Sequence, residues 1–439
     1  MTSPLEQDAL EQRYREVCSN SYGCVPYGRS RSRVRVRAPL IQFSSASGCV
    51  LTTPTGREYI DFSNAFGSVT LGHGDPVVVA AVAKAVQSGL PAGLGYSAAI
   101  QLADRLCADI GGNARAAFFT TGTTGVRAVV EAARQYTGRR LIASAGFHGW
   151  DPMWVSANSP FSLSSGDVLD FLYHADALRD FLGSHRRDVA AVVISPDYLH
   201  IGAETMRSIV RIAREYDVVI VSDEVKYGYR YSNGPSITRL GLNADIYVYA
   251  KCLSNGWPVA AAVGCHPVMD QLSTFVSTLT YSCPAFVAAN ATLARSDELQ
   301  IRNSIAAEGG RFLSSLSEVL SSSRLPLDVV GDGHSFQFVS ATPELESTLV
   351  ERALDEGLVF QPGDQQLPSY AFKAKYVDFA IGAMERVVES LKQTYGDLIG
   401  APLTEQAWFD AAWNQMDGLS DRATASPGMR EFVQSKFAD

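Results

Sequence analysis

The 439-residue sequence lacks the features that define several classes of protein. No segment approaches the roughly 20 uncharged apolar residues that cross a bilayer, and the first residues lack the apolar core of a signal peptide. The seven cysteines are scattered without a CxxC pair, which predicts neither a disulfide framework nor a zinc site. Basic side chains (37) are fewer than acidic ones (46), so no field attracts phosphate backbones. These absences predict a cytoplasmic protein with reduced thiols and no metal, membrane or nucleic-acid partner.

What the sequence does contain is enough apolar material for a large core. Hydrophobic residues make up 46% of the chain and charged residues 19%, which excludes intrinsic disorder. The length corresponds to about two or three domains. No internal repeat or low-complexity tract interrupts it.

From about residue 75 to 300, short β-branched runs alternate with amphipathic helical windows, a pattern typical of βαβ units around a mostly parallel sheet. The flanking regions combine strand-like and helical segments and predict a smaller α+β domain built from both chain ends. We therefore expect four parts: residues 1–65 and 301–400 in the small domain, 66–300 in the large domain, and 401–439 as a helical extension.

Two charged residues follow predicted neighbouring strands. Asp223 ends the run VVIVSD, and Lys251 follows IYVYA. Both are expected at the carboxyl edge of the sheet, where open α/β sheets bind ligands. Taken separately, Asp223 is equally typical of a metal ligand or a helix cap, and Lys251 of a solvated surface group.

Two further segments are candidates for binding a phosphorylated ring. TTGTTG, residues 120–125, lies between a predicted strand and a predicted helix, where backbone N–H groups bind phosphate. It is also compatible with an ordinary hydroxyl cap at a helix start. In FHGW, Phe147 is suited to cover a flat ring and His148 to assist, although core packing is the commoner role of such residues when the segment is taken alone.

The order of these segments, ending in AKCLSNGWPVAAAVG, resembles that of the class III aminotransferases, near their glutamate-1-semialdehyde aminomutase branch. The resemblance runs from about residue 33 to 395 and includes GREYIDFSNAFGSVTLGHGDP. It implies the fold-type-I architecture of pyridoxal-phosphate (PLP) enzymes, with a mainly parallel, seven-stranded sheet, PLP as cofactor, and a homodimer with composite active sites.

The resemblance also implies roles for individual residues. Lys251 matches the lysine that forms a Schiff base with PLP, and Asp223 the carboxylate that faces the pyridine nitrogen and keeps the ring an electron sink. The phosphate loop is matched by Thr121, Gly122 and Thr123. Phe147 and Val225 match the residues that cover the two faces of the ring, with His148 assisting beside them. Thr280 matches a threonine that reaches the phosphate of the neighbouring subunit.

Several positions depart from the family pattern. Thr124 replaces a common glutamate, and Phe147 lacks the usual tyrosine hydroxyl. The segment after FHG is much shorter than the gating loop of the aminomutase, and the Ser-x-x-His segment of that branch is not found near the C-terminus. These departures argue against identity with the mutase itself.

Substrate recognition is weakly signalled. Five arginines alternate from position 29 to 37 and would share one face of an extended segment, either as a charged edge strand or as a source of a carboxylate-binding arginine. The candidates are Arg29, Arg31 and Arg33. Phe66 and Lys226 match pocket positions, although core burial explains Phe66 equally well and packing behind the site is the commoner role of a residue such as Lys226.

Three functions follow from these observations. The first is transfer of an amino group from an amino-acid donor such as glutamate to a small carbonyl acceptor, in a specialised biosynthetic pathway. The second retains the cofactor but changes the reaction to an intramolecular aminomutase, a racemase or related Cα chemistry. The third is a binding module that has kept the fold and lost turnover.

Overall fold

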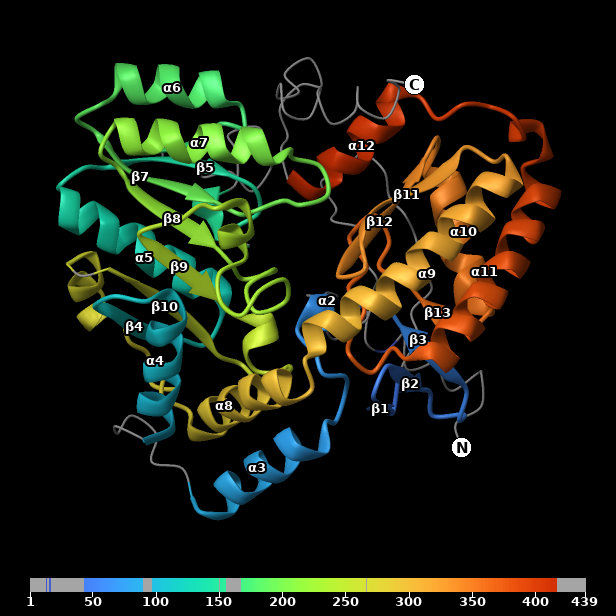
Figure 1. The fold of residues 1–439 in the computed structure, drawn as a ribbon, viewed down its shortest axis with the longest axis horizontal. Coiled ribbons are helices and arrows are strands. Elements are labelled where there is room, and N and C mark those ends of the chain that lie inside the picture. The colour runs from blue at the N-terminus through green and yellow to red at the C-terminus, as the bar shows by residue number, and fades with distance from the viewer. Residues whose placement is uncertain are drawn as a thin grey trace. The chain divides into compact units, whose positions relative to one another are not determined.

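The computed structural model describes residues 43–89, 97–149, 151–154, 167–265 and 267–416, together with the isolated residues 13 and 16. They form two compact units (Figure 1). Residues up to Asp75 and Gln300–Gln415 belong to the unit that we call the small unit, and Pro76–Leu299 make up the large unit. Among the described residues, no helix is long and apolar enough to cross a membrane.

The large unit is built on a seven-stranded sheet. Its strands lie in the order β4 (Ala114–Phe119), β10 (Ala260–Cys265), β9 (Ile246–Tyr249), β8 (Val219–Asp223), β7 (Val189–Ile194), β5 (Leu141–Ala145) and β6 (Val168–Asp170). All strands except β10 run in one direction. The central strands are buried throughout because helices cover both faces of the sheet. The prediction of a mainly parallel α/β sheet is confirmed.

Helices pack on both sides of this sheet. Figure 1 shows α5 (Gly122–Thr137) on one side, and α6 (Ala175–Ser184) and α7 (Ala203–Glu215) on the other. Two further helices, α3 (Pro76–Gln87) and α4 (Ser97–Ile110), each pack against α8 (Cys283–Glu298). The short 3-10 turns of this unit are η1 (Pro152–Trp154), η2 (Ser236–Leu240), η3 (Lys251–Leu253) and η4 (Val268–Thr274).

The sequence pattern predicts one continuous helix from about residue 296 to 323, and this prediction is wrong. The structure ends α8 at Glu298 and begins α9 (Ile301–Ser323) after Gln300, which adopts a left-handed conformation with φ 47°. A residue in that conformation cannot continue a right-handed helix. The break coincides with the boundary between the two units.

The small unit joins the two ends of the chain. Its four-stranded sheet has the order β1 (Ser45–Ser47), β2 (Val50–Thr52), β3 (Glu58–Asp61) and β13 (Leu358–Val359), with β13 parallel to β3. The remaining elements are the hairpin β11 (Leu327–Asp332) and β12 (Ser335–Ser340), the four-residue α2 (Asn64–Gly67), η5 (Gly396–Leu398), and the helices α9, α10 (Pro343–Asp355), α11 (Ala374–Thr394) and α12 (Glu405–Met416). The unit is thus α+β and draws on both ends of the chain.

The core of the small unit centres on one phenylalanine. Phe62 has no exposed surface, and its ring centroid lies 4.6–6.0 Å from those of four other phenylalanines, Phe312, Phe336, Phe360 and Phe372. Aromatic pairs at such distances contribute beyond their buried area. This cluster ties β3 to α9, β12 and the segments after them.

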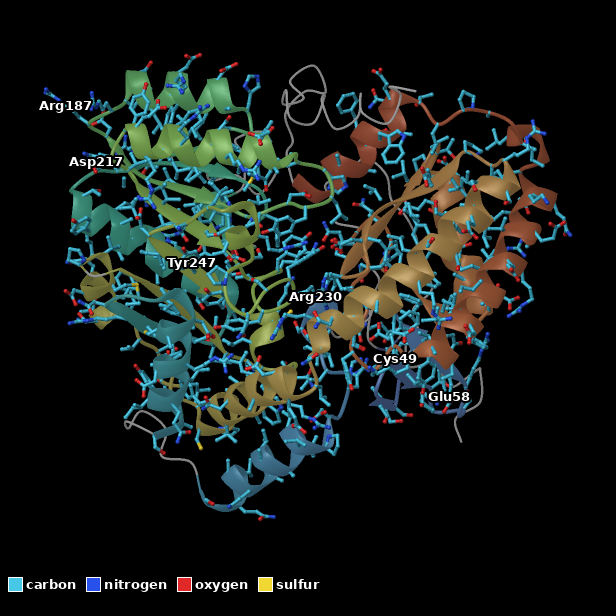
Figure 2. All side chains as sticks on the ribbon, in the orientation of Figure 1. Cys49, Glu58, Arg187, Asp217, Arg230 and Tyr247 are labelled. Atoms are coloured by element: carbon cyan, nitrogen blue, oxygen red, sulfur yellow. The ribbon has the colours of Figure 1, made fainter. Side chains whose placement is uncertain are left out.

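The direction of the parallel strands gives the large unit a chemical polarity. Arg187 and Asp217 precede β7 and β8, and Figure 2 shows both at the side of this unit that is remote from Arg230, which follows β8. Arg230 is completely buried. The side chains that follow β7, β8 and β9 therefore collect at the carboxyl edge, where parallel sheets bind ligands.

Candidate active site

Asp223 and Lys251 come from adjacent strands at this carboxyl edge. Asp223 is the last residue of β8 and pairs with Val248 of β9, and Lys251 follows three residues after Val248. Neighbouring strands are about 4.8 Å apart. Lys251 is partly buried and has φ 40°, an uncommon conformation for a residue with a side chain. A carboxylate and an amine thus leave the sheet side by side.

The Asp223 carboxylate is buried and held from two directions. Only 3% of the residue is exposed, and its Oδ1 accepts the backbone N–H of Val225 at 3.1 Å. Its Oδ2 lies 2.9 Å from Nδ1 of His148, which follows β5 and is 2% exposed. An ionised carboxylate only accepts hydrogen bonds, so Nδ1 of His148 carries the proton. The predicted assistance of His148 thus takes the form of a bond to Asp223.

The start of α5 lies against the segment that follows Asp223. An added Cβ on Gly122 would lie 2.6 Å from one methyl carbon of Val225 and 2.8 Å from the other. Only glycine permits this approach. Thr121 caps the helix, because its Oγ1 accepts the N–H of Thr124 at 3.2 Å and the side chain of Thr124 returns to the backbone of Thr121. Thr121 therefore fulfils the capping interpretation, and the helix start still presents N–H groups to an anion.

Thr123 and Phe147 complete this side of the edge. A Cβ on Gly149, which has φ 94°, would collide with the side chain of Thr123, so the glycine after His148 lets this loop pack closely on α5. Phe147 is partly exposed and directly precedes His148. The predicted phosphate loop, the Phe-His-Gly segment and Val225 therefore meet around the amino end of α5.

Thr280 lies in a separate turn of the large unit. The residue is buried, and its Oγ1 accepts the backbone N–H of Ser277 at 3.0 Å and bonds the Ser277 hydroxyl at 2.9 Å. Beside it, Val276 and Leu279 are 65% and 61% exposed. The turn thus presents apolar side chains to its surroundings.

The predicted substrate residues belong to three different parts of the chain. Arg29, Arg31 and Arg33 lie outside the described residues. Phe66 is part of α2 in the small unit, where it is partly buried and has φ 55°. Lys226 is in the large unit just beyond Val225, with its Nζ 5.8 Å from the ring centroid of Tyr227.

Sequence reasoning missed a second buried aspartate-histidine pair. Asp197 lies three residues beyond β7, and its Oδ2 is 3.1 Å from Nδ1 of His200. Its Oδ1 accepts the N–H groups of Leu199 and His200, and His200 has no exposed surface. Burial favours a raised pKa for Asp197, but the attraction of His200 and these hydrogen bonds outweigh it and lower the pKa. The available signal was the polar pair in SPDYLH directly after a buried strand.

Glu224 is a further ionisable residue at this edge that the sequence analysis did not identify. It is completely buried beside Asp223, and burial raises its pKa. Ser222, Ser236 and the N–H of Ile237 all donate to its carboxylate. These donors oppose the effect of burial, and Glu224 thereby ties the end of β8 to η2.

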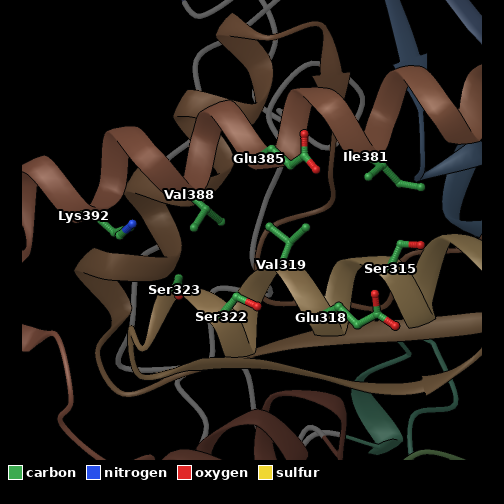
Figure 3. Close-up of a pocket in the computed structure, with 9 residues that line it drawn as sticks. All are labelled: Ser315, Glu318, Val319, Ser322, Ser323, Ile381, Glu385, Val388 and Lys392. Atoms are coloured by element: carbon green, nitrogen blue, oxygen red, sulfur yellow. The ribbon is translucent and has the colours of Figure 1, made fainter.

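A groove in the small unit is unrelated to this site. Figure 3 shows it between α9 and α11, with the apolar Val319, Ile381 and Val388 beside Glu318, Glu385 and Lys392. It contains none of the predicted site residues.

Comparison with known proteins identifies the family. The family model of aminotransferase class III matches residues 32–388. The chain belongs to the class III aminotransferases. It is similar to 2'-deamino-2'-hydroxyneamine transaminase of Streptomyces kanamyceticus, with 29% identity over 336 residues that cover 72% of this chain and 84% of that protein.

A second relative and one solved structure are also similar to this chain. Glutamate-1-semialdehyde 2,1-aminomutase of Symbiobacterium thermophilum is 32% identical over 266 residues, which cover 56% of this chain and 61% of that protein. The FumI protein of Sphingopyxis sp. MTA144, solved in a PLP form, has a TM-score of 0.81 at 23% identity and covers 89% of this chain and 98% of its own. The fold-type-I architecture is confirmed, and the chain is an enzyme of a PLP-dependent family.

The residues at the carboxyl edge fit PLP. The buried Asp223 offers an anion for a protonated pyridine nitrogen, and Lys251 on the next strand offers an amine for an aldehyde. Gly122 packs against the Val225 side chain at the start of α5, and the N–H groups at the start of a helix are suited to bind a phosphate. The residues predicted to face the ring nitrogen, the aldehyde and the phosphate of PLP thus lie in one unit.

Proposed function

We propose that this enzyme transfers an amino group from an amino-acid donor such as glutamate to a small carbonyl acceptor, with Lys251 and Asp223 as its catalytic residues. The observation that carries the proposal is their placement at the carboxyl ends of adjacent strands, with Asp223 opposite Val248 and Lys251 just beyond it.

Each residue has a role that its contacts support. Lys251 would hold the cofactor through its amine and would act as the base that takes a proton from Cα of the donor and as the acid that returns it. Asp223, held by His148 and Val225, would keep a proton on the ring nitrogen. When bound, PLP supplies the electron sink. Thr121, Gly122 and Thr123 would hold its phosphate at the start of α5, and Phe147 and Val225 would cover its ring.

We infer that the working enzyme is a homodimer with composite sites. The support is the turn around Thr280, which leaves two large apolar side chains, Val276 and Leu279, mostly exposed. Exposed apolar groups of this kind favour burial in an interface. A second copy would cover them and receive Thr280 at its own phosphate site. Within each copy, the domain limits at residues 65, 300 and 400 are part of the same proposal.

The substrate assignments also stay proposals. Arg29, Arg31 or Arg33 would bind a substrate carboxylate, and Phe66 and Lys226 would shape the pocket. The similarity to a protein named 2'-deamino-2'-hydroxyneamine transaminase supports an acceptor from a specialised biosynthetic pathway.

Intramolecular transfer is the second candidate, and the similarity to glutamate-1-semialdehyde 2,1-aminomutase favours it. Single-turnover mixing separates the two functions. The PLP-loaded enzyme is mixed with glutamate, and release of one equivalent of the keto acid per site supports transfer between molecules. Absence of keto-acid release across a panel of amino acids contradicts the proposal and favours the mutase.

The role of Lys251 has its own test. Borohydride reduction of the PLP-loaded protein should attach the cofactor irreversibly, and peptide mass spectrometry should find it on Lys251. Lys251→Ala should bind PLP without being modified and lose activity by about 10²–10⁴-fold, the range for a group that transfers a proton. Modification of another lysine in the unsubstituted protein would refute the assignment. Lys84, on α3, is a surface control whose replacement by alanine should change neither result.

A further inference from the structure

The proposed mechanism uses one nitrogen of His148 and leaves the other unexplained. Nδ1 bonds Asp223, while Nε2 is buried and has no hydrogen-bond partner in the described part of the chain. A buried polar atom without a partner destabilises the folded protein. A neighbouring group that donates a hydrogen bond to Nε2 of His148 would therefore stabilise the folded protein.

Trp154 is the neighbour that carries a matching donor. Its ring centroid lies 4.8 Å from that of His148, with 54° between the ring planes. Its Nε1 is likewise buried and without a partner in the described residues. Indole Nε1–H can only donate, and an imidazole nitrogen without a proton can only accept. Two complementary orphan atoms thus belong to two rings in contact.

The segment that carries Trp154 is anchored independently of His148. The Asp151 carboxylate accepts the N–H of Met153 at 3.0 Å and pairs with Arg127 of α5 at 3.0 Å. These bonds fix the short turn η1 against the helix whose first residues form the proposed phosphate site. Trp154 is therefore held at His148 by the same element that organises the site.

We propose that Trp154 is a positioning residue whose Nε1–H is linked to Nε2 of His148 through one bridging water molecule. This link completes a chain in which Trp154 donates to the water, the water donates to Nε2 of His148, and His148 donates through Nδ1 to Asp223. It holds His148 as the neutral tautomer with its proton on Nδ1. The inference rests on the proposed role of Asp223.

The consequence for the chemistry is electrostatic. A protonated His148 would place a second positive charge beside Asp223 and compete with the ring nitrogen for its negative charge. A donor at Nε2 disfavours that protonation, because the lone pair that would take the proton is already engaged. Trp154 thereby reserves the charge of Asp223 for the cofactor.

The tautomer can be measured by NMR of protein labelled at the histidine ring nitrogens, with and without PLP. The His148 signals, identified by their loss in His148→Asn, should show a protonated Nδ1 and an Nε2 that accepts a hydrogen bond. In Trp154→Phe the Nε2 signal should move toward that of a nitrogen without this bond. PLP should then bind about fivefold more weakly, which corresponds to one net hydrogen bond of about 1 kcal/mol. Trp257→Phe, which alters a partly exposed tryptophan of the same unit, should leave all values unchanged.

Two results would overturn the inference: a proton on Nε2 in the unsubstituted protein, or His148 signals that do not respond to Trp154→Phe. If that variant does not fold, the indole N–H of Trp154 provides a second measurement. In the unsubstituted protein it should exchange slowly with solvent, and His148→Asn should make it exchange faster. Fast exchange in both proteins would reject the bond. Failure of PLP to attach to Lys251 would instead refute the proposed function and leave the tautomer result valid.

Discussion

The two units of this enzyme contain the same small device in different settings. In each, an aspartate at or just beyond a strand end accepts backbone N–H groups with Oδ1 and holds a histidine with Oδ2. In the large unit the device occurs as Asp223–His148 and Asp197–His200, with both histidines buried. In the small unit it occurs as Asp61–His73, and the His73 side chain is 19% exposed.

The difference between these pairs shows what the sheet adds to a local motif. Asp61 ends β3, a short strand that pairs with β2 and β13, whereas Asp223 and Asp197 follow neighbouring parallel strands. Only the second arrangement brings two carboxylates and two imidazoles to one edge of a sheet. Burial and then the charges of nearby groups, among them Asp197 and Asp223, raise the pKa of Tyr173 well above its usual value, so both carboxylates act on one phenol. The local motif stabilises a turn, and its repetition on adjacent strands makes a site.

Among substitutions that test the difference between these pairs, the largest loss of activity is expected at Asp223. Asp223→Asn keeps the side-chain size and the bond to Val225 N–H but removes the charge, so activity should fall by about 10²–10⁴-fold, the range for a group that controls a proton in the reaction. Steady-state kinetics of the PLP-loaded protein measure it. Asp61→Asn makes the same change in the small unit and should leave kcat within about threefold, since a neutral partner suffices for a turn. Equal losses in the two variants would show that Asp223 is only structural.

The next largest effect should be on stability rather than chemistry. Phe62→Ala removes the ring at the centre of the small-unit cluster and should lower the free energy of unfolding by about 3–5 kcal/mol, the range for a buried aromatic side chain. Denaturant unfolding measures the loss. The visible absorbance of bound PLP should not change, because every proposed PLP contact within one chain lies in the large unit. A changed spectrum in the folded variant would show that the small-unit core also shapes the cofactor site.

A carboxylate in the small unit shows what happens when a buried acid has few hydrogen-bond donors. Glu346 accepts only the N–H of Gly363 among the bonds described here, at 2.9 Å, and burial raises its pKa to about 7. Between pH 4.5 and about 7 the folded protein binds this proton more tightly than the unfolded chain, so stability falls as pH rises through that window. The difference between the two pKa values corresponds to a loss of about 3 kcal/mol in the free energy of unfolding across this window.

Glu346→Gln keeps the acceptor and removes the charge. It should therefore stabilise the protein at pH 8 and have little effect at pH 4, as measured by thermal unfolding at both values. A variant that is equally stable relative to the parent at both pH values would show that Glu346 is solvated.

The smallest effect, a change in PLP affinity, is expected from replacing the histidines of the other two pairs, His200 and His73. His200→Asn shortens a buried imidazole beside the Asp223 strand and should weaken PLP binding by about tenfold, as expected for loss of one hydrogen bond to a charged group. His73→Asn, the matched change in the small unit, should leave PLP binding unchanged. Fluorescence titration with PLP measures both. Equal binding by the two variants would confine His200 to a structural role.

Some features of the fold and of the candidate site could be predicted from the sequence because they depend on residues close together in the chain. The strand ends at Asp223 and Tyr249 follow from the ends of β-branched runs, and the adjacency of Asp223 and Lys251 follows from the rule that parallel strands end at one edge. The segments around Gly122 and His148 were likewise found from glycine and hydroxyl patterns at a strand-to-helix turn. The break at Gln300 was not, because a single glutamine in a left-handed conformation leaves no periodic signal.

The sequence by itself determined the sheet, the identity of its helices and the family resemblance, since each depends on hydrophobic period and on residues close together in the chain. Only the tertiary structure decided which polar atoms meet. Asp197 and His200 form a local pair, but its position beside Asp223 depends on β7 lying next to β8. The contact of Trp154 with His148 required the large unit to pack, and the gathering of five phenylalanine rings from positions 62 to 372 required the small unit to pack. Packing joins residues by shape and burial, and neither is periodic in sequence.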